Sequence, residues 1–346
     1  MSGDGASLLE TRIPSPNAEW LAQINEDILE PDLPIVDPHH HLWDMRGKRY
    51  LLEDLLEDLN SGHNIVATVF LECASMFRKD GPEHMKPIGE TEFVNGIAAM
   101  SASGRYGPAR VAAGIVGFAD LTLGDAVAPV IEAQLAAGGG RFRGIRQNAA
   151  WDASDAVPVA REKRPPHLFM GDAFRAGFAH LARHGLTFEA WCYHPQIPEV
   201  TDLARAFPDT TIVLNHLGGP LGVGPYAGKR ESVFAQWRSD LSELAACPNV
   251  HAKLGGLNMP INGHRWHDRP KPPTSSELCA VTRPWYEHAL AVFGVERCLF
   301  ESNFPVDSAS CSYAVLWNSF KRLTEGYSAS EKAALFHDNA MRLYRL

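Results

Sequence analysis

Short apolar runs alternate with stretches of helical periodicity along most of this chain. The apolar runs cover residues 35–41, 65–72, 111–118, 142–146, 187–191, 211–216, 250–254 and 298–301. Apolar residues recur at helical spacing in residues 51–59, 92–102, 126–137, 173–182, 199–207, 232–246 and 284–293. Because strands buried on both faces are almost continuously apolar, this alternation is typical of a parallel sheet covered by helices.

The eight runs predict a closed (β/α)8 barrel of the TIM type, built as a single domain, and 346 residues is an ordinary length for one. A doubly wound open sheet is the alternative, weakened because no Gly-x-Gly-x-x-Gly motif follows an early run. Residues 1–30 are polar and mixed, so we expect an N-terminal arm lying over a barrel of residues 31–346. The irregular stretch at about 255–276 is expected to form a long loop over the C-terminal face, where barrel active sites lie.

The composition narrows the partners of the chain. A net charge of −9 provides no broad basic surface, so nucleic acid is not expected as a partner. No apolar stretch approaches the roughly 18 residues of a membrane span, and the first residues lack the pattern of a signal peptide. The six cysteines form no CxxC pair, which favours free or buried thiols in a reducing compartment. We therefore expect a cytoplasmic protein, either a monomer or a homo-oligomer.

The strongest local motif is a run of three histidines at the end of the first predicted strand. Side chains alternate along a strand, so His39 and His41 should share one face while His40 points away. Two imidazoles on one face at a strand end make half of a metal site. The alternative is a histidine-rich turn that binds nothing.

Two further histidines follow other predicted strands. His194 follows the fifth run, and His216 ends the sixth. Three strand ends would thus present histidine to one rim of the barrel. Imidazole suits zinc, manganese or iron as a ligand.

Charged residues at strand ends are candidates for substrate binding or acid–base chemistry. Arg146, at the end of the fourth run, is placed to bind a carboxylate or sulfonate, and Arg78 could assist it. Lys253 lies near the end of the seventh run, and Glu72 ends the second. For each of them a structural ion pair is the alternative reading, because buried charges need partners. Tyr193 could contribute to an aromatic rim around the substrate.

Four segments of the chain resemble the amidohydrolase-2 family. They are the DPHHHLWD segment at 37–44, FRGIR at 142–146, NHLGGP at 215–220 and FESNFP at 300–305. This family includes sugar-lactone and pyrone-dicarboxylate lactonases, muconolactone-type hydrolases and non-oxidative decarboxylases. The resemblance covers roughly residues 34–346, with the segments in the family's order.

The resemblance implies a set of site residues on a (β/α)8 barrel. His39, His41 and His194 would hold a divalent metal in metal-using members, with zinc expected first and manganese second. His216 would lie near the reacting group. The family's acid on the eighth strand is here Asn303, and an amide can neither act as a base nor match a carboxylate as a ligand.

The departure at position 303 requires another carboxylate if the chain is a hydrolase. Glu72 is the best substitute, and Asp307, four residues beyond Asn303, is the next. We therefore expect a hydrolase that opens a lactone bearing an anionic group, which Arg146 binds while a metal polarises the carbonyl. A metal-dependent decarboxylase of an aromatic or muconate-type acid is the first alternative. A catalytically degenerate barrel that only binds a ligand is the second, and Asn303 favours it.

Overall fold

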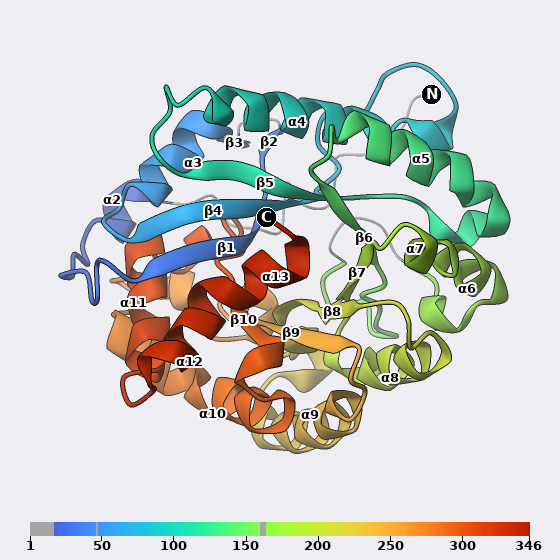
Figure 1. Cartoon of the computed structure of the whole chain (residues 1–346). Helices are drawn as coiled ribbons and strands as arrows, with labels where there is room; N and C mark the ends of the chain where they lie inside the picture. The colour runs from blue at the N-terminus through green and yellow to red at the C-terminus, as the bar shows by residue number, and fades with distance from the viewer. Residues whose placement is uncertain (1–16, 46–47, 160–163) are drawn as a thin grey trace, which may run out of the picture.

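The computed structural model describes residues 17–45, 48–159 and 164–346. Within these residues, eight parallel strands follow one another around a barrel in chain order, with helices outside them (Figure 1). The strands are β1 (Pro34–His40), β4 (Asn64–Leu71), β5 (Arg110–Gly117), β6 (Phe142–Asn148), β7 (Thr187–Trp191), β8 (Ile212–Leu214), β9 (Val250–Leu254) and β10 (Cys298–Phe300). All eight predicted apolar runs are therefore strands.

The barrel closes where the chain beyond β10 meets β1. His40 and Phe304 form a parallel bridge, and the amide of His41 donates to the carbonyl of Phe304 at 2.8 Å. The buried Asp37 carboxylate accepts from the Ser302 hydroxyl at 2.6 Å and from the Tyr313 hydroxyl at 2.9 Å. Burial raises the pKa of Asp37 to about 6. These contacts confirm the predicted closed barrel and fix the segment that carries the histidines.

The helices agree with the seven predicted stretches and extend them. They are α2 (Ala18–Leu21), α3 (Leu52–Leu59), α4 (Ile88–Ala102), α5 (Ala128–Ala137), α6 (Asp172–Phe178), α7 (His180–Arg183), α8 (Ile197–Ala206), α9 (Arg230–Ala245), α10 (Ser275–Phe293), α11 (Tyr313–Leu323), α12 (Ala329–Ala333) and α13 (Asn339–Tyr344). Sequence reasoning missed α11 to α13 and the short antiparallel pair β2 (Trp43–Met45) and β3 (Lys48–Tyr50).

The predicted start of α10 at residue 284 was wrong. The helix begins nine residues earlier, because Thr274 and Glu277 form a capping box at its start. The Thr274 hydroxyl accepts from the Glu277 amide at 3.2 Å, and the Glu277 carboxylate accepts from the Thr274 amide at 2.8 Å. Such reciprocal caps satisfy two otherwise unpaired amides. Pro284 lies inside the helix, which continues past it.

The helix α13, at the C-terminal end of the chain, lies against the barrel strands β1 and β10 (Figure 1). Tyr344 is fully buried in a cluster with Val36, Leu71 and Leu299 from the barrel strands. Its hydroxyl donates to Glu189 on β7. These contacts fill the barrel interior with side chains, so open space for a ligand lies at the carboxyl ends of the strands.

The predicted N-terminal arm falls partly outside the described residues, which begin at 17. The described part is tied to the loop after β9 and to α11. The Trp20 indole donates to the carbonyl of Arg269 at 2.9 Å, and the Leu29 amide donates to Asn318 at 2.9 Å. Among the described residues, no helix combines the length and apolar character needed to cross a membrane. The six cysteines are free and buried, as predicted.

Candidate active site

A cavity of about 140 Å³ lies at the carboxyl ends of the strands. Its described lining consists of His41, Trp43, Glu72, Cys73, Arg146, Asn148, Pro158, Val159, Trp191, Tyr193, His216, Met259, Pro260, Ile261, Asn303 and Val306. The lining comes from the ends of β4, β6, β7 and β8 and from the segments after β1, β9 and β10. The predicted loop over this face therefore contributes to the cavity, through Met259, Pro260 and Ile261.

The histidines at the end of β1 point to different sides, as the strand alternation predicts. The ring centres of His39 and His41 lie 5.0 Å apart, and His39 and His216 lie 4.5 Å apart. His40 points away and contacts the Thr68 hydroxyl at 2.9 Å through Nε2. The Nδ1 of His41 donates to the carbonyl of Leu71 at 2.8 Å, which leaves the lone pair on Nε2.

Burial keeps the first two imidazoles of the site neutral. It is the main reason that the pKa values of His39 and His41 lie well below the ordinary value. The positive charge of Arg146 lowers both further, and His216 and Lys253 add to the effect on His39. Neutral imidazoles keep a lone pair, so these two residues can accept a hydrogen bond or bind a cation.

Glu301, one residue beyond β10, anchors His216. Its Oε1 accepts from the Nδ1 of His216 at 2.6 Å and also from the backbone amide of His216 at 3.3 Å. Because a carboxylate only accepts, Nδ1 carries the proton and Nε2 carries the lone pair. The indole of Trp191 packs edge-on against this ring, with centres 4.8 Å apart. His216 thus lines the cavity with its ring held in place by Glu301.

Two glycines after β9 make room for this pair. A side chain on Gly255 would meet Glu301 at 2.3 Å, and one on Gly256 would meet the imidazole of His216 at 2.2 Å. Gly256 also adopts a φ of +64°, a region that other residues rarely occupy. His216 itself has a φ of +53°, and Asn303 one of +58°. Left-handed backbone at non-glycine residues costs energy and concentrates at functional sites, and both residues line the cavity.

Arg146 and Glu72 form a buried ion pair in the cavity wall. The Nε of Arg146 donates to Oε1 of Glu72 at 2.8 Å, and a second nitrogen donates to the carbonyl of Glu72. The third nitrogen lies 3.3 Å from Nε2 of His39. The structure therefore shows the ion-pair alternative for both residues. The guanidinium has five N–H donors, so this pairing leaves donors for a ligand in the cavity.

Asp307 contacts Asn303, the residue at the position of the family's acid. Asn303 lines the cavity and donates through Nδ2 to Oδ1 of Asp307 at 3.2 Å. Asp307 is fully buried and is not part of the cavity lining. Burial is the main cause that raises its pKa well above the ordinary value. The structure therefore places Asp307 outside the described cavity lining, and a role of Asp307 as a base stays a prediction.

Lys253 was predicted to contact the substrate but is fully buried away from the cavity lining. Its ammonium lies 3.0 Å from Oε2 of Glu189 and donates to the carbonyl of Pro38 at 2.8 Å. β7 and β9 are not neighbours in the sheet, so this ion pair spans the barrel interior. A buried charge needs such a partner, and the contact with Pro38 supports the histidine segment from below.

Arg78 and His194 also lie outside the site, whereas Tyr193 lies within it. Arg78 is exposed and pairs with Glu92. The Nδ1 of His194 accepts from the Leu221 amide at 3.3 Å, and its ring packs against Tyr226. Neither Arg78 nor His194 lines the cavity. Tyr193 does, and its hydroxyl donates to the carbonyl of Pro158 at 2.6 Å.

The donor set that suits a metal differs from the predicted one. Among the described residues, His39, His216 and Glu301 place ligand atoms within 4.8 Å of one another, and His41 and His194 are not in this group. The Nδ1 of His39 and Oε2 of Glu301 lie 2.6 Å apart but are not aligned as a hydrogen bond. Both atoms are buried without a hydrogen-bond partner in the described structure. Two imidazoles and a carboxylate fit a divalent metal, which would satisfy these two atoms.

The structure thus combines a closed barrel with a histidine-lined cavity at its C-terminal face. A family model described as amidohydrolase matches residues 36–346, so the chain belongs to the amidohydrolase family. An uncharacterized protein, y4mH, from Sinorhizobium fredii is 36% identical and covers 91% of this chain and 99% of that protein. The L-fucono-1,5-lactonase of Burkholderia multivorans is 27% identical, over 90% of this chain and 96% of that protein. An amidohydrolase structure from Burkholderia multivorans, with bound zinc, has the same fold with a TM-score of 0.70 at 24% identity, over 90% of this chain and 99% of that one.

Proposed function

We propose that this protein opens a lactone ring by adding water to the ester carbonyl, with His216 as the general base. The observation that carries the proposal is the Glu301–His216 pair, which directs an imidazole lone pair into a cavity that also contains Arg146. The lactonases among its relatives support the choice of an ester ring, although they are at most 27% identical.

The side chains of this site can carry out each proton transfer of the reaction. Nε2 of His216 takes a proton from water as the oxygen attacks the carbonyl carbon, and Glu301 stabilises the imidazolium that forms. The remaining N–H donors of Arg146 stabilise the negative charge on the carbonyl oxygen. When the ring C–O bond breaks, the imidazolium returns the proton to the departing alkoxide. The product is a hydroxy acid, which ionises and releases one proton at neutral pH.

A divalent metal in this site, with zinc as the first choice, is the alternative to His216 acting as a free base. His39, His216 and Glu301 would hold it, and it would polarise the carbonyl as a Lewis acid. His216 cannot serve as a ligand and as a free base at once. Activity with and without chelator therefore distinguishes the two roles.

The expectation that the substrate carries an anionic group depends on Arg146. The ion pair between Arg146 and Glu72 changes that expectation. The charge of Arg146 is already compensated, so the carbonyl oxygen is its better-suited partner in the proposed reaction. A carboxylate or sulfonate on the substrate remains a prediction. It is tested by comparing each lactone with its carboxylated counterpart.

The test is a panel of five- and six-membered lactones, including L-fucono-1,5-lactone, followed by proton release and by carbon dioxide detection. We expect one proton per ring opened, no carbon dioxide, and loss of at least 100-fold in kcat for His216→Gln, the range of general base catalysis. His288→Gln, at a histidine that does not line the cavity, is the matched control. Carbon dioxide release from aromatic acids would show a decarboxylase instead. Lactone binding without turnover would show a degenerate barrel.

A further inference from the structure

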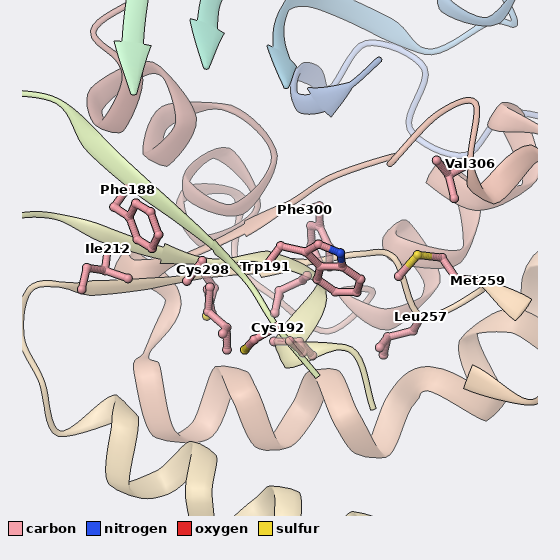
Figure 2. Close-up of a cluster of buried hydrophobic side chains, with 14 of the residues drawn as sticks. Phe188, Trp191, Cys192, Ile212, Leu257, Met259, Cys298, Phe300 and Val306 are labelled. Atoms are coloured by element: carbon pink, nitrogen blue, oxygen red, sulfur yellow. The ribbon is translucent and has the colours of Figure 1, made fainter. Parts of the chain in front are cut away.

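Among the described residues, the floor of the cavity is lined by polar side chains and its walls mainly by apolar ones. The polar side chains His41, Glu72, Arg146, His216 and Asn303 come from the strand ends or the segments directly after them. Six wall residues, Trp43, Pro158, Val159, Met259, Ile261 and Val306, offer almost only apolar surface. Trp191, Met259 and Val306 belong to the buried apolar cluster drawn in Figure 2.

Two of the polar atoms near this wall are already engaged. The hydroxyl of Tyr193 donates to the carbonyl of Pro158 at 2.6 Å, and the side-chain oxygen of Asn148 accepts from the Ala150 amide at 2.8 Å. A ligand with several hydroxyl groups would lose its bonds to water against such a wall. Each hydroxyl buried there without a partner therefore weakens binding.

Building on the proposed function, we propose that the natural substrate carries an alkyl or aryl substituent on its lactone ring, and is not a polyhydroxylated sugar lactone. The reacting carbonyl lies at the floor with His216 and Arg146, and the substituent lies against Met259, Ile261 and Val306. Apolar contact with these side chains supplies affinity in proportion to the area that it removes from water.

The first experiment compares kcat/KM for γ-butyrolactone with γ-lactones of increasing alkyl length, and with a polyhydroxylated lactone of the same ring size. We expect about a fourfold rise for each buried methylene, the factor that ~0.8 kcal/mol represents at 25 °C. Ile261→Asn should flatten this dependence, whereas Ile97→Asn, on α4 outside the cavity lining, should preserve it. A flat series, or a higher kcat/KM for the polyhydroxylated lactone, would overturn the proposal while leaving lactone opening intact.

A second measurement separates this proposal from the proposed reaction. Alkyl cyclopentanones have the ring and substituent but no ester bond, and Trp43 and Trp191 in the lining should report their binding by fluorescence. Tighter binding with longer alkyl chains, in a protein that opens no lactone, would support the apolar wall and reject lactone hydrolysis. An affinity that does not change with alkyl chain length would contradict the proposed contact with the apolar wall.

Discussion

The carboxylate of Glu301 lies 2.6 Å from Nδ1 of His216, and both side chains are buried at the mouth of the barrel. Glu301 follows β10 and His216 follows β8, so β9 lies between the two strands. Gly255 and Gly256, which follow β9, leave the space in which the two side chains meet. The pair therefore depends on three consecutive strands, and its geometry is fixed by the barrel itself.

Glu301→Gln should reduce kcat by about 100-fold or more with little change in KM. The amide keeps the shape of the side chain but cannot stabilise an imidazolium, and it can leave His216 in the wrong tautomer. The measurement is kcat and KM on a lactone that the wild type opens, with circular dichroism to verify folding. Glu296→Gln, at an exposed ion pair with Arg342, is the control. Wild-type kcat in Glu301→Gln would show that this pair has no role in catalysis.

Glu72→Gln and Arg146→Met should each destabilise the fold by about 3–5 kcal/mol, because each leaves one buried charge without its partner. The two residues are 2% and 7% exposed, so solvent provides little compensation. The double variant should be more stable than the sum of the single losses indicates, since it removes both charges. Free energies of unfolding from urea titrations measure this coupling. Additive losses would mean that the ion pair contributes nothing of its own.

Local sequence patterns were enough to predict the barrel, because strand and helix periodicity depend on neighbouring residues. The alternation that separates His39 and His41 from His40 is local in the same way. His194 was misplaced because the chain leaves β7 at Trp191 and enters a short 3-10 turn, where strand alternation no longer holds. The position of His194 just after a strand therefore did not reveal where its side chain points.

The main site residue that sequence reasoning missed is Glu301. It was visible as the last residue of the last apolar run, but its partners His39 and His216 are far away in the chain. Lys253 shows the same limit: its position at a strand end predicted a ligand contact, while Glu189 on another strand determines its role. Pairings across a barrel depend on the register of all strands, which no local pattern contains.

Asp58 provides a test of stability against pH away from the site. Burial is the main cause that raises its pKa to about 7, although the Tyr50 hydroxyl donates to it at 2.6 Å and lowers the pKa in part. A carboxyl with a raised pKa in the folded state stabilises the fold at low pH, and this contribution is lost as pH rises from about 4 to about 7. The Tm of Asp58→Asn should therefore gain on that of the wild type across this window. Parallel Tm curves from pH 4 to pH 7 would contradict the raised pKa.

Metal binding should depend on His39 and His216 but not on His194. The structure groups His39 and His216 with Glu301, whereas His194 contacts the Leu221 amide. His194→Asn keeps an oxygen that can accept from that amide, so its effect on folding should be small. We expect His39→Asn and His216→Asn to weaken zinc binding by at least 10-fold, because each removes one ligand, and His194→Asn to bind zinc as the wild type does. Equilibrium dialysis with zinc, repeated with manganese, measures the affinities without relying on turnover. Loss of zinc in His194→Asn alone would restore the ligand set that the family resemblance implies and would reject the group at Glu301.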